Sequence, residues 1–343
     1  MCYVNLVREI MKKYLTLIRP YGLLFLGLTP VFGAIANGGF ASSHLIILLI
    51  IGSLIHIFGF AQNDYYDVEI DSKSKYVSKR PLVIGCISQK ITIFIFVSSF
   101  LVSLLLSFVF IFTFFSFVVL LLSFLCMFLY NKYSKHQVGM EYILGLGVFN
   151  CGIYGALTVS NNISFFAILI SSMGFMQWLF SVGISANLKD VEFDSKQGIR
   201  TTPIMFGVRI SDKKLILPLS FIIYAFFIKF IHIIIASLSF FIGFTSIFIY
   251  NLPIPGICFL IISIILLYLT LKILSTPIKK RDKMLIYAGV QEGLSLLLIP
   301  IVLMSYLIEN ISIFTTFLLI SVIIVWPIFW FRILFGKRMI PLE

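Results

Sequence analysis

Runs of apolar residues long enough to cross a lipid bilayer fill most of this chain. A transmembrane helix needs about 20 such residues, and 60% of the 343 residues are hydrophobic while 12% are charged. This composition is typical of an integral membrane protein and excludes a soluble domain with a large core. We therefore predict an all-α, polytopic membrane helix bundle that forms a single domain over residues 1–343, with about ten spans. They are expected at 15–37, 44–62, 91–112, 114–130, 140–160, 163–186, 214–236, 254–274, 284–306 and 312–334.

Positive charge alternates from one connection to the next. Of the 26 Lys and Arg residues, only Lys229 falls outside this alternation. The positive-inside rule then predicts that both termini are cytoplasmic in the cell membrane. The connections left without Lys or Arg are those around 37–44, 160–163, 237–253 and 307–311. Topology and attraction to anionic lipid account for the net charge of +12, so no nucleic-acid partner is expected.

The apolar stretch 214–250 is too long for one span. Reading it as two spans would place the basic segment 279–283 outside, against the charge alternation. We therefore expect one span at 214–236 and an interfacial or re-entrant piece at 238–250. The N-terminus shows no short apolar region with a small-residue cleavage site, so we expect no removable signal peptide.

Two acidic clusters, at 63–71 and 187–194, follow the second and sixth apolar runs. They hold seven of the fourteen acidic residues. On a helix, positions i, i+3 and i+7 share one face, which groups Asp64, Asp67 and Asp71, and likewise Asn187, Asp190 and Asp194. Carboxylates this close need a cation between them, and hard oxygen ligands suit Mg²⁺ bound together with a phosphate. The pattern predicts a site for a metal-bound polyphosphate, with its mouth on the cytoplasmic side.

The clusters indicate an internal repeat, because each is followed by a similar segment. One reads Arg80-Pro81 with Gly85 behind it, and the other reads Arg200-Thr201-Thr202-Pro203 with Gly207 behind it. A unit of four spans thus occurs twice with the same orientation. Both connections would meet at one mouth, where two metal ions lie between the carboxylate faces and basic side chains reach the phosphate oxygens.

These motifs resemble those of the UbiA superfamily of intramembrane prenyltransferases. The similar residues are Asn63-Asp64-x-x-Asp67-x-x-x-Asp71 with Arg80-Pro81-Leu82 and Gly85-x-Ile87-Ser88, then Asp190-x-x-x-Asp194 with Gly198-x-Arg200-Thr201, and Arg19-Pro20 at the start of the first span. The resemblance covers about 15–306. The segment 307–343, which carries an additional C-terminal helix, and the piece 238–250 depart from the family pattern.

The resemblance implies a helix bundle around a central cavity, in which Mg²⁺ bridges acidic motifs and the diphosphate of an isoprenoid donor. It implies transfer of the prenyl group to a small hydrophobic, membrane-associated acceptor with release of diphosphate. Asp67, Asp71, Asp190 and Asp194 are the expected catalytic carboxylates. The expected metal ligands are Asn63, Asp64, Asp67, Asp71, Asp190 and Asp194. The expected diphosphate contacts are Arg80, Lys132, Lys189 and Arg200. Glu69 and Glu192 point away from the acidic faces by the helical spacing and are left out.

Polar residues inside the spans add further hypotheses. His56 precedes Asn63 by seven residues and shares its helix face. It would either orient or deprotonate an acceptor or be a hydrogen-bonded histidine of the bundle. Glu292 and Lys229 are intramembrane ions, but their different depths argue against close contact. The five cysteines show no paired metal spacing.

Several alternatives remain open on the sequence alone. The acceptor is either an isoprenoid glycerol phosphate, as in ether lipids, or a ring precursor of the quinone or chlorophyll type. A transporter would place its ionisable groups near the bilayer midplane, commonly between inverted repeats, whereas these clusters lie at span ends. A non-catalytic isoprenoid-binding protein would not need the complete set of carboxylates.

Overall fold

The computed structural model describes residues 2–211 and 214–338, so the last residues of the predicted segment 307–343 lie outside the described part. Within these residues, nine helices are long and apolar enough to cross a membrane, and a bent pair at the N-terminus makes ten. The predicted membrane helix bundle is confirmed. Its helices are α1 Cys2–Ile18, α2 Leu23–Ala36, α3 Ser42–Asp71, α4 Gln89–Phe110, α5 Phe114–Tyr133, α6 Met140–Leu157, α7 Phe165–Phe180, α8 Asn187–Gln197, α9 Thr202–Met205, α10 Leu219–Phe241, α11 Ile254–Ser275, α12 Arg281–Val302, α13 Met304–Asn310 and α14 Ile313–Phe335.

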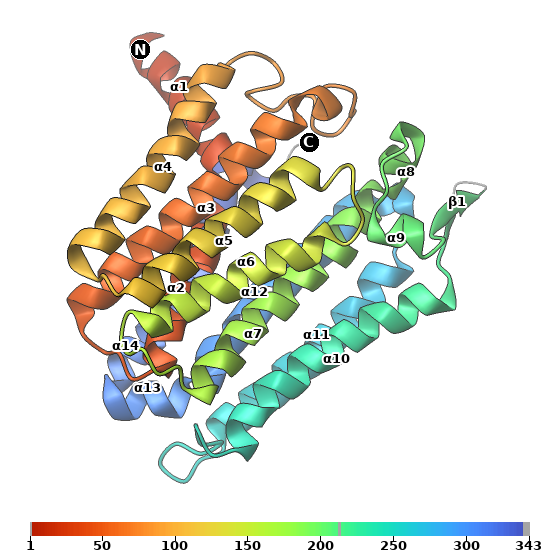
Figure 1. Cartoon of the computed structure of the whole chain (residues 1–343). Helices are drawn as coiled ribbons and strands as arrows, with labels where there is room; N and C mark the ends of the chain where they lie inside the picture. The colour runs from red at the N-terminus through yellow and green to blue at the C-terminus, as the bar shows by residue number, and fades with distance from the viewer. Residues whose placement is uncertain (1, 212–213, 339–343) are drawn as a thin grey trace.

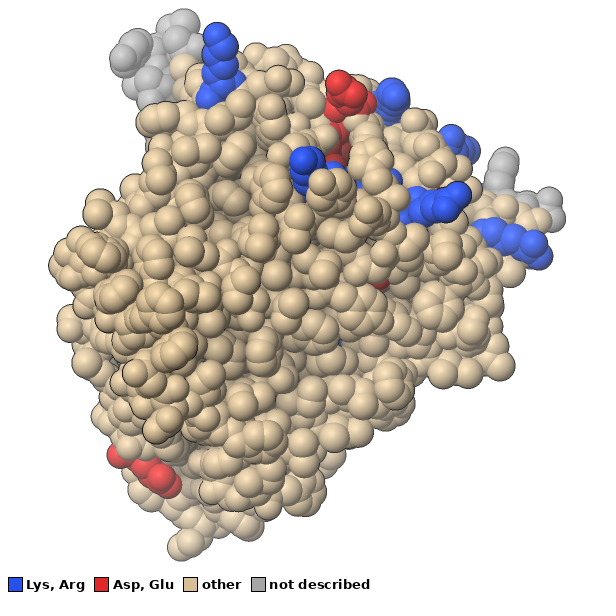
Figure 2. Space-filling view, in the orientation of Figure 1, with Lys and Arg blue, Asp and Glu red and all other residues tan. Residues whose placement is uncertain are grey.

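One end of the bundle carries the features that the sequence singles out. Both termini, the loop after α3 and helix α8 lie at this end (Figure 1). The Lys and Arg side chains seen on one face gather toward it, and a broad uncharged surface covers the middle of the molecule (Figure 2). The uncharged surface is the part that fits a bilayer core.

The first predicted span is not one continuous helix. α1 and α2 meet at a 41° bend, and a short 3₁₀ turn, Pro20–Gly22, lies between them. Arg19 at the bend has φ 53° and ψ 62°, in the left-handed region. Proline lacks the N–H that would continue the helix and disfavours the α conformation in the residue before it. The expected uninterrupted span 15–37 is therefore wrong in detail.

The seventh span also differs from the prediction. A two-stranded antiparallel hairpin, β1 Arg209–Ser211 and β2 Lys214–Ile216, comes first, with Arg209 opposite Ile216. α10 begins only after Pro218 and continues to Phe241. Residues 242–253 then form a non-helical connection before α11. The predicted span 214–236 is thus displaced toward the C-terminus, and the piece expected at 238–250 is divided between the end of α10 and this connection.

Small residues bring two helices into backbone contact near the centre of the bundle. A Cβ atom on Gly33 of α2 would lie 1.9 Å from the Gly152 carbonyl oxygen of α6, and one on Gly155 of α6 would lie 1.8 Å from the Pro30 carbonyl oxygen of α2. Both distances exclude any side chain. Close packing of this kind is how helices associate where lipid removes the hydrophobic driving force between them.

Candidate active site

The first acidic cluster lies on the last two turns of α3. Asp64, Asp67 and Asp71 are all buried, with relative exposures of 4%, 4% and 6%, whereas Glu69 is exposed. The Asn63 amide donates to Asp67 Oδ2 at 3.3 Å. The i, i+3, i+7 spacing therefore places one carboxylate face toward the interior, as predicted.

Two arginines neutralise the end carboxylates of this face. The Arg19 Nη2 atom lies 2.5 Å from Asp64 Oδ1. Arg80 Nη1 lies 2.6 Å from Asp71 Oδ2 and 3.2 Å from Asp64 Oδ1. The loop that carries Arg80 is closed by the Pro81 carbonyl, which accepts from the backbone N–H groups of residues 86 and 87. The loop geometry thus holds a guanidinium group over the carboxylates.

Lys135 pairs with Asp67, the middle carboxylate of the first cluster, and lies between the two clusters. Its Nζ atom lies 3.6 Å from Asp67 Oδ2. Burial lowers the pKa of Lys135, but the negative charges of Asp67, Asp194 and Asp71 raise it and outweigh burial. Lys135 also lines a small cleft together with Asn187 at the start of the second cluster, so it lies between the two halves of the site.

The second cluster begins directly after a π-helical turn, Ser181–Ala186, at the start of α8. Asp194 is buried, while the Asp190 side chain is one third exposed. Asp190 pairs with Lys189 at 2.9 Å and with Arg281 at 2.7 Å. π-helical turns are rare and often occur at functional sites.

Arg281 joins connections that lie far apart in the sequence. It stands at the first residue of α12 and donates to the Lys189 carbonyl at 2.7 Å. Its guanidinium carbon lies 4.0 Å from the centroid of the Tyr76 ring, in the loop after the first cluster. One residue therefore contacts the surroundings of both acidic motifs.

The other proposed phosphate contacts differ in position. Lys189 belongs to the second cluster, as described above. Arg200 is exposed and lines a cleft of about 30 Å³ together with Lys135, Asn187 and Thr201. That volume has room for roughly two water molecules. Lys132 is exposed, and its Nζ atom lies 5.3 Å and 5.7 Å from the ring centroids of Tyr133 and Phe128. The structure brings Lys189 and Arg200 near the acidic residues but turns Lys132 toward these rings.

His56 lies deeper in the bundle, on the same helix as the first cluster. It is 1% exposed, and its Nε2 atom lies 3.1 Å from the backbone carbonyl oxygens of both Ile18 and Arg19. Carbonyl oxygens only accept, so Nε2 carries the proton. These contacts support the hydrogen-bonded histidine among the two roles considered from the sequence.

Lys229 and Glu292 occupy one buried polar region below the acidic clusters. Lys229 is fully buried and donates to Gln177 Oε1 and to Ser295 Oγ, at 3.3 Å each. Glu292 accepts a hydrogen bond from Ser181. Within the described part of the chain, no ion pair joins Lys229 to Glu292.

The carboxylates suit a divalent cation only in company with further ligands. Among residues 2–211 and 214–338, no three His, Cys, Asp or Glu side chains converge into a ready-made metal site. Mg²⁺, however, is usually held by one or two carboxylates together with substrate phosphates and water. The buried aspartates supply oxygen ligands of this kind, so the donor set fits Mg²⁺ with a polyphosphate.

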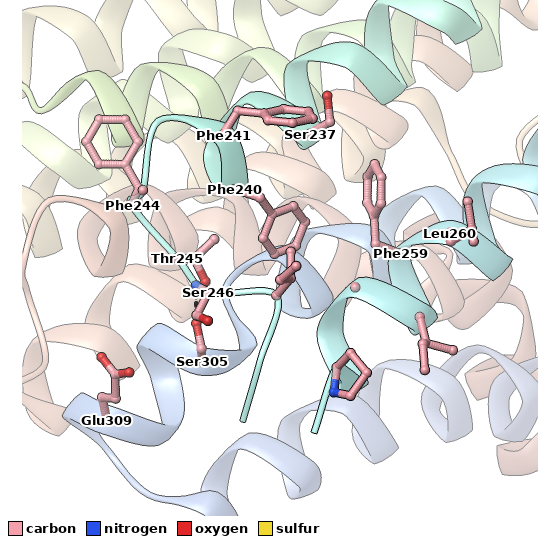
Figure 3. A pocket seen from close by; sticks show the side chains of 15 residues that line it. Ser237, Phe240, Phe241, Phe244, Thr245, Ser246, Phe259, Leu260, Ser305 and Glu309 are labelled. Atoms are coloured by element: carbon pink, nitrogen blue, oxygen red, sulfur yellow. Dashed lines mark hydrogen bonds between the residues drawn. The ribbon is translucent and has the colours of Figure 1, made fainter. Parts of the chain in front are cut away.

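A larger cavity, of about 830 Å³, lies at the opposite end of the molecule. It is lined by the end of α10, the following connection, the start of α11 and α13, and aromatic side chains such as Phe240 and Phe259 contribute to its lining (Figure 3). Thr245 and Ser305 face each other inside it, and their hydroxyl oxygens are 2.6 Å apart. This cavity has no part of either acidic motif in its lining and is separate from the candidate site.

Comparison with known proteins agrees with this geometry. The sequence profile of the UbiA prenyltransferase family matches residues 23–287, which include both acidic clusters. The chain belongs to the UbiA prenyltransferase family. It is accordingly a membrane prenyltransferase, and the family assignment made from the motifs is confirmed.

Relatives of this UbiA protein include two archaeal digeranylgeranylglyceryl phosphate synthases. The one from Thermococcus sibiricus is 28% identical over 211 residues, covering 59% of this chain and 71% of the relative. The one from Korarchaeum cryptofilum is 28% identical over 197 residues, covering 57% of this chain and 68% of the relative.

Solved structures share the fold. A UbiA homologue from Archaeoglobus fulgidus, bound to GPP and Mg²⁺, has a TM-score of 0.58 at 19% identity and covers 84% of this chain and 99% of its own. A digeranylgeranylglyceryl phosphate synthase structure has a TM-score of 0.59 at 20% identity, with coverage of 88% and 99%. Identities this low establish the common fold and nothing further.

Sequence reasoning did not assign three cationic residues that the structure places on the carboxylates, namely Arg19, Lys135 and Arg281. Arg19 could have been identified from the sequence, because Arg19-Pro20 resembles the start of the first span in the UbiA family. Lys135 and Arg281 carried none beyond their positive charge, since only the tertiary arrangement decides which basic residue meets which carboxylate.

Proposed function

We propose that this protein transfers a prenyl group from an isoprenoid diphosphate to the hydroxyl group of an isoprenoid glycerol phosphate, in a Mg²⁺-dependent reaction. The observation that carries the proposal is the set of cationic groups on the two acidic clusters. Arg19, Arg80 and Lys135 pair with the first cluster, and Arg281 pairs with the second while lying on Tyr76 beside the first. Such an arrangement suits a metal-bound diphosphate rather than a solvated acidic surface.

Asp67, Asp71, Asp190 and Asp194, with Asn63 and Asp64, are the residues proposed to hold Mg²⁺ and the diphosphate. When bound, the metal supplies positive charge to a leaving group that must become more negative. The basic side chains of Arg19, Arg80, Lys135 and Arg281 form ion pairs with these carboxylates. Bound diphosphate would give these guanidinium and ammonium groups phosphate oxygens as partners, in bidentate geometry for arginine.

The reaction breaks the bond between the allylic carbon and the diphosphate oxygen, and that carbon forms a new bond to the acceptor oxygen. The electron pair of the broken bond leaves with the diphosphate, and the proton of the acceptor hydroxyl passes to water or to the released diphosphate. Arg19, Arg80, Lys135 and Arg281 are placed to stabilise charge that develops on the departing oxygens, which is the largest contribution that a preorganised site makes to such a step. Arg200 and Lys189 lie close enough to the mouth to assist.

The acceptor class is supported by the relatives, which are named digeranylgeranylglyceryl phosphate synthases. This favours an ether-lipid precursor over the ring precursors that the sequence left open. The alternation of basic residues further supports a mouth on the cytoplasmic side, where water-soluble diphosphate would be released.

The test uses purified protein in detergent with geranylgeranyl diphosphate, Mg²⁺ and a panel of acceptors. We expect diphosphate release and a product mass equal to acceptor plus the prenyl group with geranylgeranylglyceryl phosphate, and loss of both with EDTA. Product formed only with an aromatic acceptor would overturn the acceptor class. No product with any acceptor, combined with solute flux in proteoliposomes, would overturn prenyl transfer by this chain.

A further inference from the structure

At the break between α1 and α2, three consecutive backbone carbonyls, those of Ile18, Arg19 and Pro20, accept hydrogen bonds from side chains of other helices. A left-handed conformation at Arg19 is unfavourable for a residue with a Cβ atom. Such conformations persist only where surrounding contacts hold them, and they gather at functional sites. Arg19 fits this description because its side chain ends on Asp64.

One face of α3 holds Arg19 from one side. His56 donates to the carbonyls of Ile18 and Arg19, the Phe60 ring lies 4.7 Å below the guanidinium carbon, and Asp64 accepts from Nη2. These three residues are four apart, so they lie on successive turns of the same helix face. Helix α3 therefore contacts both the backbone and the side chain of Arg19.

Helix α14 holds the break from the other side. Trp326 donates its Nε1 hydrogen to the Pro20 carbonyl at 2.7 Å. The ring of the adjoining Tyr21 stacks on Phe331 of α14, with centroids 4.6 Å apart. α14 lies beyond residue 287, where the match to the family profile ends.

We infer that Trp326 and His56 are positioning residues that fix Arg19 over the first acidic cluster, and that α14 thereby contributes to the site from outside the family core. The effect on turnover rests on the prenyl transfer proposed above. Loosening the Pro20 carbonyl would let the Arg19 guanidinium leave the place where the diphosphate is bound, which lowers kcat more than it changes KM for the donor.

The test compares Trp326→Phe with Trp330→Phe. Both replacements remove an indole N–H and keep an aromatic ring, but the Trp330 Nε1 atom is buried without a hydrogen-bond partner. We expect Trp326→Phe to lower kcat at least about fivefold with little change in KM, while Trp330→Phe keeps the wild-type kcat. Equal kcat in both variants would overturn the inference.

A double-mutant cycle separates positioning from a general loss of structure. If Trp326 acts through Arg19, Trp326→Phe should change kcat less than about twofold in an Arg19→Gln background, because coupled residues are not additive. Additive losses would show that Trp326 does not act through Arg19. His56→Gln keeps a donor near the Nε2 position and should retain most of the kcat that His56→Leu loses.

Amide hydrogen exchange tests the anchor without any turnover. In Trp326→Phe, the amides of Gly22 and Leu23 should exchange faster than in wild type and in Trp330→Phe, since their carbonyl partners lie in the break. Unchanged exchange would refute the anchor even if kcat fell. Wild-type protein that releases no diphosphate, but shows this exchange difference, would refute the proposed function and leave the anchor in place.

Discussion

Arg281 and Asp190 form an ion pair of 2.7 Å, although 91 residues separate them in the chain. The same guanidinium group lies on Tyr76, in the loop after the first acidic cluster. Arg281 thus has a role at the second cluster similar to that of Arg80 at the first. Each cluster is thus paired with an arginine from outside its own helix, and such pairing offsets the cost of placing carboxylates in the protein interior.

Removal of one carboxylate from either half should abolish turnover. We expect Asp67→Ala and Asp190→Ala each to lower diphosphate release by at least about a hundredfold, roughly 2.7 kcal/mol of transition-state stabilisation. The matched controls are Glu69→Gln and Glu192→Gln, which alter acidic residues of the same motifs that face away or pair with Lys196. Substantial release by either alanine variant would contradict a site shared between the halves.

Arginine at position 80 should not be replaceable by lysine. Arg80 reaches two carboxylates with one guanidinium group, and lysine offers a point charge in place of that fork. We expect Arg80→Lys to lower kcat at least about tenfold, or about 1.4 kcal/mol, at unchanged expression. Arg200→Lys should have a smaller effect, because Arg200 is exposed. Normal kinetics in Arg80→Lys would show that Arg80 only sets the membrane orientation and does not contact the diphosphate.

Two lysines three residues apart should differ in their effect on catalysis. Lys135→Met leaves Asp67 without its ammonium partner, so we expect kcat to fall at least about tenfold. In the wild-type protein the raised pKa of Lys135 keeps its ammonium group protonated, so the wild-type kcat should not fall between neutral and mildly alkaline pH through loss of this charge. Lys132→Met, whose ammonium lies over aromatic rings, should stay within about threefold of wild type. A larger loss of kcat in Lys132→Met than in Lys135→Met would show that Lys132, and not Lys135, contacts the phosphate.

Single cysteines in a cysteine-free background should report the topology. We expect a membrane-impermeant maleimide to label Lys73→Cys and Lys280→Cys from the cytoplasm and Asn161→Cys from the outside, because basic residues gather in alternate connections. All three positions are exposed, whereas Ser74 is buried. The structure supports placing Lys73 and Lys280 on the same side. α10 is the single helix between β2 and the connection 242–253, so α11 brings the chain back to the side of β2 before Lys280. Labelling of Lys280→Cys from outside would contradict it.

Local patterns predicted the local parts of this structure. The spacing of Asp64, Asp67 and Asp71 placed them on one face because helical geometry alone decides it. The repeat predicted that both clusters would lie at one mouth, and Arg281 contacts Asp190 of the second cluster and Tyr76 in the loop after the first. Local patterns did not show which basic residue would pair with which carboxylate. Lys132 ends α5 as part of the helix, whereas Lys135 lies past its end and turns toward Asp67.

Helix ends were harder to predict than helices. Pro20 and Pro218 both mark places where an apolar run changes direction, one at the break before α2 and one at the start of α10. Hydropathy does not distinguish a strand hairpin such as 209–216 from the beginning of a span. Pro20, which lies inside the first apolar run, is the sequence signal that would have corrected the first span.

The π-helical turn at Ser181–Ala186 acts as a one-residue insertion in the register of the helix that carries the second cluster. Each added residue turns everything downstream by about 100° about the helix axis. The direction of the Asp190 side chain therefore depends on the wide turn. Straightening the turn into a regular α-helix, with no residue removed, would leave the composition and hydropathy of the span unchanged, yet it would rotate Asp190 by about 100° away from Arg281.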